Sequence, residues 1–185
     1  VLCSMFRKLR DGRFHKVETD PIHVIIYKEN ITTSSSEWMT LMENAYVWYD
    51  FWSQPQPSQE TDKDRIVQTG KDLKLAIDSV AAYVERADML VILAPSSVHA
   101  DMLDKQTGRK VYTCYRTWRR RGFCVLELFA SFFSRRSTHS VLLMQSIHDP
   151  PTWIAAHESL KLAVGECDFT CCETNHLGYD GNTSM

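Results

Sequence analysis

Met89-Leu90-Val91-Ile92-Leu93-Ala94 is a continuous apolar run that ends at Pro95-Ser96-Ser97. An unbroken apolar run is typical of a strand that is covered on both faces, whereas a half-exposed strand alternates. We therefore expect residues 89–94 to form a central strand. Short apolar runs that favour strands also occur elsewhere along the chain, at 22–27, 46–50 and 140–146.

Segments with helical patterns separate these expected strands. We expect helices at residues 37–45, 71–86 and 122–134, and a fourth that begins at Asp149 and ends at Gly165. This alternation predicts an α/β fold: a flavodoxin-like open parallel sheet with helices on both faces. The expected strand order is 2-1-3-4-5 with a degraded or missing last strand, so that residues 22–27 flank the central strand.

Four regions of the chain are expected to be irregular within or beside this fold. Residues 1–20 are charged and aperiodic and are interpreted as an approach segment before an α/β domain at 21–165. Residues 51–70 are expected to form a long loop with at most a helical turn near Arg65, and residues 96–117 are polar and irregular. Residues 166–185 form a Cys-rich tail.

The composition limits the classes of partner and compartment. The chain has 185 residues, 44% of them hydrophobic, and a formal net charge of −2, which fits one globular domain and argues against a nucleic-acid partner. No run approaches the roughly 20 apolar residues of a membrane span. The six cysteines are irregularly spaced, so we expect reduced thiols in a cytoplasmic protein.

Cations are concentrated in one part of the chain. Residues 109–136 contain eight Lys and Arg residues and a single acid, Glu127. Such a segment is able to hold a small anion, a nucleotide or an acidic protein surface, and it is equally able to be a solvated face. We expect the arginines at 116–121 to form an exposed basic patch, in which Arg119 and Arg120 are candidate nucleotide-binding residues.

Three segments together resemble the Toll/interleukin-receptor (TIR) domain family over roughly residues 22–165. Val47-Trp48-Tyr49-Asp50 is similar to the family's second strand, and the helix through Leu75-Ala76-Ile77-Asp78-Ser79 leads, as in the family, into the third strand. Phe123-Cys124-Val125-Leu126-Glu127-Leu128 resembles the family's W-C-x-x-E-L motif, with Phe in place of Trp. The first strand departs from the family pattern, because Tyr27-Lys28-Glu29-Asn30 replaces its acidic, Ser-rich signature.

The resemblance implies two functions. The first is a signalling module that acts through self-association or by binding other TIR-like domains. The second is an NAD glycohydrolase in which Glu127 stabilises an oxocarbenium-like transition state, with NAD as substrate and no cofactor. Trp52 would stack on a ring, Asp50 would orient a ribose or cap its loop, and Ser96 would lie on the ligand side of the sheet.

A metal site in the tail is the last candidate. Cys167, Cys171, Cys172 and His176 are close in sequence, but their spacing matches no common zinc motif. We therefore predict no bound metal.

Overall fold

The protein has an α/β fold built on a mixed, five-stranded open sheet. The computed structural model describes residues 2–49, 53–56, 61–103, 107–134 and 140–161. The strand order is β2-β1-β7-β6-β3, in which β1 pairs parallel with β7, β3 pairs parallel with β6, and the other two pairs are antiparallel. The strands of the sheet are β1 (Lys16–Thr19), β2 (Thr32–Ser34), β3 (Met89–Leu93), β6 (Ser140–Met144) and β7 (Thr152–Ile154).

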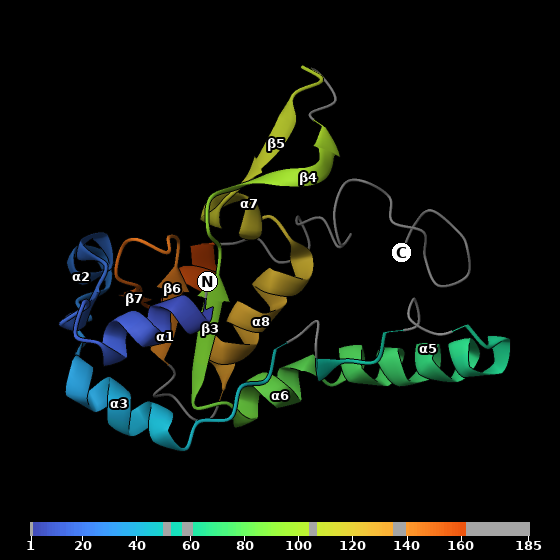
Figure 1. The fold of residues 1–185 in the computed structure, drawn as a ribbon, viewed down its shortest axis with the longest axis horizontal. Coiled ribbons are helices and arrows are strands. Elements are labelled where there is room, and N and C mark those ends of the chain that lie inside the picture. Colours follow the sequence, from blue (N-terminus) through green and yellow to red (C-terminus); the bar gives the residue numbers. More distant parts are fainter. Residues whose placement is uncertain (1, 50–52, 57–60, 104–106, 135–139, 162–185) are drawn as a thin grey trace.

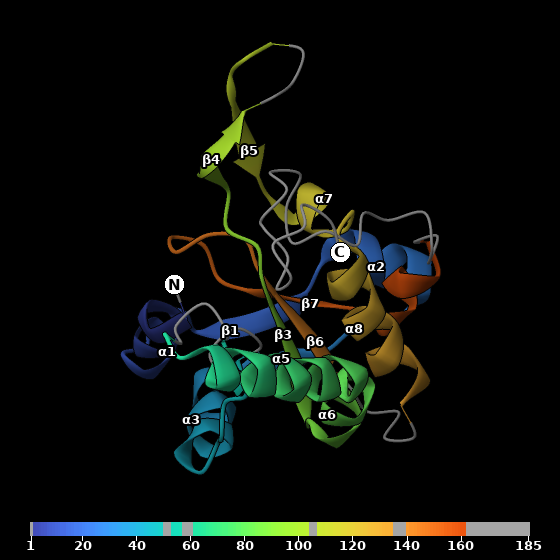
Figure 2. The ribbon, with the colours of Figure 1, turned by 90° about the vertical axis from the view of Figure 1, so that its right-hand side faces the viewer.

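Helices cover both faces of this sheet (Figures 1 and 2). One face packs against α1 (Leu2–Arg10) and α3 (Ser35–Glu43). The other face packs against α8 (Gly122–Phe133), which lies beside α6 (Val80–Arg86). The molecule is therefore a three-layer sandwich with the sheet in the middle.

The side-chain alternation of β6 divides the core into two clusters. Leu142 and Met144 point toward α1 and α3, where they pack with Trp38 and Trp153. The intervening Val141 and Leu143 point toward α8 and pack on Leu128, as the two-residue period of a strand requires. All four β6 side chains are buried, which is why this strand reads as a continuous apolar run.

Several elements confirm the sequence-based expectations. β3, β6, α3 and α8 fall where strands and helices are predicted, within a few residues. The start of α3 is fixed by a capping box, in which Ser34 and Glu37 bond each other's backbone N–H groups. A long helix around residues 71–86 is also present, although it begins earlier, as α5 (Lys63–Asp78), and is separated from α6 at Ser79.

The prediction of a strand at residues 22–27 is wrong. This run is a helix, α2 (Pro21–Tyr27), because Asp20 accepts a hydrogen bond from the backbone N–H of Ile22 as N-cap and Pro21 occupies the first turn. The helix ends at Lys28, whose backbone has a left-handed conformation. On one face, α2 leaves Ile22, Ile25 and Ile26 exposed.

The purely parallel flavodoxin-like order is also wrong, and β3 is not central. Within the described residues β3 pairs only with β6 and is the last strand of the sheet. A central β3 would need a strand from residues 22–27 as its neighbour, and that segment is helical. The two apolar faces of β3 are instead covered by helices, and one of its edges has no paired strand among the described residues.

Five further segments differ from expectation. Residues 1–20 contain α1 and β1, which contribute to the core, and the expected loop at 51–70 includes the first half of α5. Residues 46–49 of the strand expected at 46–50 are neither helix nor strand, and Asp50 lies outside the described residues. Most of the polar segment 96–117 forms a hairpin and a short helix. The helix expected after Asp149 is replaced by β7 and a 3₁₀ helix, η2 (Ala156–Lys161). The elements of the polar segment are β4 (Ser97–Leu103), β5 (Lys110–Thr113) and α7 (Tyr115–Trp118).

Two elements extend away from the sandwich. The β4–β5 hairpin rises from the end of β3, and α5 continues outward from α6 (Figures 1 and 2). None of the α5 side chains is fully buried, and Val67 and Leu75 are exposed. Among the described residues no helix is long and apolar enough to cross a membrane.

Candidate functional site

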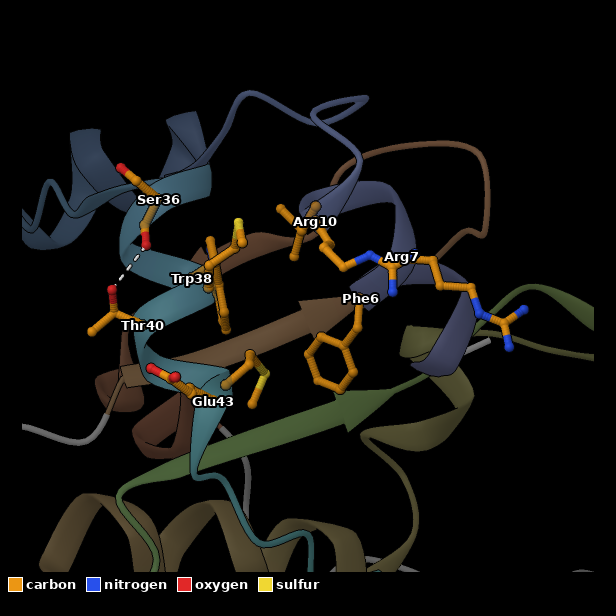
Figure 3. A pocket seen from close by; sticks show the side chains of 10 residues that line it. Phe6, Arg7, Arg10, Ser36, Trp38, Thr40 and Glu43 are labelled. Carbon is orange, nitrogen blue, oxygen red and sulfur yellow. Dashed lines mark hydrogen bonds between the residues drawn. The ribbon is translucent and has the colours of Figure 1, made fainter.

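A groove with an apolar floor runs between α1 and α3 (Figure 3). It has a volume of about 660 Å³. Its floor consists of Phe6, Leu9, Trp38 and Met42, which belong to or pack against the core cluster on this face of the sheet. The groove is large enough for several side chains of a bound segment, because ligand pockets of proteins start at about 300 Å³.

Helical spacing places these residues on the groove side of each helix. In α1, Met5, Phe6 and Leu9 follow the three- and four-residue spacing of one helix face, and in α3 Trp38 and Met42 are one turn apart. Trp38 is only 1% exposed and stacks on Trp153, with ring centroids 5.5 Å apart. The floor of the groove is thus anchored to the sheet.

Polar side chains form the rim of the groove. Arg7 and Arg10 come from α1, whereas Thr40 and Glu43 come from α3 (Figure 3). Arg10 pairs with Asp11 at 3.0 Å. Within the described part of the chain, Arg7 and Glu43 are exposed and have no ion-pair partner.

The groove lies on the face of the sheet that β3 shares with α1 and α3. Phe6 sits above this strand in Figure 3, and the odd-numbered residues of β3 pack against the same cluster as Phe6 and Met42. Those three residues are Met89, Val91 and Leu93. Four of the five β3 side chains are half-exposed, as expected for an edge strand. The groove, together with the edge of β3 that is unpaired among the described residues, is called the β3 surface.

A second constellation surrounds Glu158 on η2, whose side chain is 6% exposed. One carboxylate oxygen lies 3.2 Å from the Arg119 guanidinium, and the other lies 3.4 Å from Lys161 Nζ and accepts a hydrogen bond from the Tyr27 hydroxyl at 3.1 Å. His23 Nδ1 accepts the backbone N–H of Ala155 at 3.0 Å, so its neutral ring carries the proton on Nε2, 3.7 Å from Glu158. We call this group the Glu158 cluster.

The Glu158 cluster joins three parts of the fold. It ties α2, the α7–α8 junction and η2 together, and its widest contact joins His23 and Glu158, which are 135 positions apart. Burial raises the pKa of Tyr115 above its ordinary range, and the Glu158 carboxylate adds to that shift, so Tyr115 stays neutral at physiological pH. Both Glu158 oxygens already have partners, which favours a structural ion-pair network over a general base.

The predicted nucleotide-site residues lie in several places. Ser96 is exposed just beyond β3, Arg120 is exposed after α7, and Glu127 is half-buried on α8. Arg119 is engaged by Glu158. None of these four lines the groove or a second hollow, of about 460 Å³, on the outer side of α3. Asp50 and Trp52 lie outside the described residues, so the nucleotide site stays a prediction.

The catalytic role of Glu127 makes a quantitative prediction. If Glu127 stabilises an oxocarbenium-like state, Glu127→Gln lowers nicotinamide release from NAD at least about 100-fold, or about 3 kcal/mol of barrier. The measurement is nicotinamide release by purified wild type and variant at the same protein concentration. Equal turnover by the two proteins would exclude this role.

The basic patch is present in part. Arg116, Arg120 and Arg121 are exposed, whereas Arg119 is partly buried against Glu158 and its guanidinium lies over the Tyr115 ring.

No group of three or more potential metal ligands occurs among the described residues. The tail residues Cys167, Cys171, Cys172 and His176 lie outside them.

Comparison of the chain with known protein families, with curated proteins and with solved structures finds no match. The TIR resemblance therefore rests on its three sequence motifs alone. One of its structural expectations, a central third strand, is not met by β3. The β3 surface and the Glu158 cluster are the sites that the structure itself defines.

Sequence reasoning missed both of these sites. The spacing of Met5, Phe6 and Leu9 was the available signal for α1 and hence for one wall of the groove. No local signal connects His23 with Glu158, because a contact between residues so far apart in the sequence depends on the strand order.

Proposed function

We propose that this chain is a protein-interaction module that binds a partner strand at the β3 surface. The observation that carries this proposal is that β3, which is wholly apolar, has one edge that no other described residue pairs with. An edge strand offers a row of unpaired backbone N–H and C=O groups, and proteins use such edges to bind an added strand.

The two edges of the sheet contrast sharply. β2, at one edge, is a three-residue polar strand, Thr32–Ser34, and is a poor template for further pairing. β3, at the other edge, has five apolar residues, no charge and no proline, and it keeps a regular register with β6 without a bulge. Natural proteins usually protect an edge strand with a charged residue, a proline or a bulge, so the absence of all three from β3 favours a paired state.

The groove supplies side-chain contacts beside this backbone template. Alternate side chains of an added strand would point to the α1–α3 side, where Phe6, Trp38 and Met42 present apolar surface. Hydrogen bonds to the backbone would provide affinity and the groove would provide specificity. The signalling context stays a prediction from the TIR resemblance.

Photo-crosslinking tests this proposal. Met39 is exposed at the groove, and Tyr112 is exposed on the projecting hairpin, so a photoreactive phenylalanine at each gives a matched pair. We expect irradiation in an extract of the expressing cells to join a second polypeptide at position 39 and not at position 112. Equal products at both positions, or none at position 39, would contradict the proposal.

A further inference from the structure

The charged side chains at the two ends of the groove have opposite signs. Glu43 lies on the side of the groove where β3 begins, and Arg7 lies on the side toward which β3 runs (Figure 3). Within the described residues neither has an ion-pair partner. The groove thus has one negative and one positive end, aligned with the strand direction.

We propose that the partner is a second copy of this chain, paired antiparallel through β3; this inference rests on the function proposed above. A two-fold axis perpendicular to the sheet would place the start of one β3 opposite the end of the other. The two sheets would become one continuous sheet, with the α1–α3 grooves of both copies on the same face.

This symmetry brings opposite charges together. Glu43 of each copy would face Arg7 of the other, and the two-fold axis repeats the contact, so two ion pairs form at once. Parallel pairing of the same two edges would need a two-fold axis along the strands, which puts the two grooves on opposite faces of the sheet, so Arg7 and Glu43 of the two copies would not meet. The charge pattern is therefore complementary to itself only in the antiparallel arrangement.

The apolar parts of the surface also suit a second copy. The exposed β3 edge carries Met89, Val91 and Leu93 on the groove side and Leu90 and Ile92 on the α8 side. An identical strand laid against it presents apolar side chains on both faces, so both apolar layers of the core continue across the interface.

A charge-swap series tests the second-copy inference by sedimentation velocity over a range of protein concentrations. We expect wild type to dimerise, and Arg7→Glu or Glu43→Arg alone to weaken the dimer about 10-fold or more, since each puts two pairs of like charges in contact. The double variant, Arg7→Glu with Glu43→Arg, restores opposite pairs and should return to within about threefold of wild type. Lys71→Glu, on the projecting α5, is the charge-reversal control and should leave the dimer unchanged.

Three outcomes would overturn this inference. The first is a wild type that stays monomeric at every concentration, and the second is a double variant as weak as the two single changes combined. The third is a dimer broken by Ile25→Glu and insensitive to the Arg7 and Glu43 changes, which would place the interface on α2. A monomeric wild type that still crosslinks through position 39 to a different protein would overturn the second copy and leave the proposed function standing.

Discussion

Trp38→Ala is expected to destabilise the protein by about 4 kcal/mol, within the range of about 3–5 kcal/mol for removing a buried large aromatic side chain. Trp38 is 1% exposed and stacks on Trp153 at an interplanar angle of 9°. Its loss opens a cavity between α3 and the sheet at the floor of the groove. Because folded domains are stable by only about 5–15 kcal/mol, this is a large fraction of the total.

Urea unfolding followed by circular dichroism measures the effect, with two control variants. Trp38→Phe keeps a buried ring, and it loses no hydrogen bond because the indole N–H has no partner in the described structure, so we expect a cost of about 1–2 kcal/mol. Trp48→Ala removes a half-exposed ring that contacts Tyr83 and should cost less than about 1 kcal/mol. A loss for Trp38→Ala no larger than that for Trp48→Ala would contradict the described packing of α3.

Glu158→Ala is expected to cost about 2–3 kcal/mol of folding free energy. Removing one member of a fully buried ion pair costs about 3–5 kcal/mol. We expect a smaller loss of about 2–3 kcal/mol here because solvent screens the partners Arg119 and Lys161, whose side chains are 30% and 45% exposed. The change also removes the acceptor of the Tyr27 hydroxyl and the carboxylate that faces His23. All of these groups lose their common partner in one substitution.

Glu29→Ala is the matched control for Glu158→Ala. Glu29 also pairs with a histidine, His157, at 2.9 Å, but both side chains are at least one-third exposed. An exposed pair of this kind contributes at most about 1 kcal/mol. If chemical unfolding shows equal losses for the two variants, the Glu158 cluster does not hold α2, the α7–α8 junction and η2 together.

Short sequence patterns are sufficient to predict the strands and helices whose formation depends on neighbouring residues in the chain. The apolar runs of β3 and β6, the stripe of α8 and the Ser34–Glu37 capping box are each visible within a short window of sequence. In α2 two local signals conflicted. Its β-branched run favours a strand, but Asp20 and Pro21 begin a helix, and these two residues decide the outcome.

The sheet order and both sites depend on contacts between residues that are far apart in the sequence, which no short stretch of sequence reveals. Alternating strands and helices are compatible with parallel and mixed sheets alike, and β7 is only three residues long after two prolines. The β3 surface exists because β3 is at the edge and because α1 and α3, 24 residues apart, meet above it. The Glu158 cluster likewise requires β1 and β7 to be neighbours, which brings α2 beside η2.

Backbone amide hydrogen exchange in β3 reports whether the edge of this strand becomes paired when the protein associates. If two copies pair through β3, amides within Met89–Leu93 gain protection as the protein concentration rises through the association range. Amides of β6, which are already paired on both sides, should exchange at the same rate throughout. Association with no change in β3 exchange would contradict the account, because it would place the interface elsewhere on the molecule.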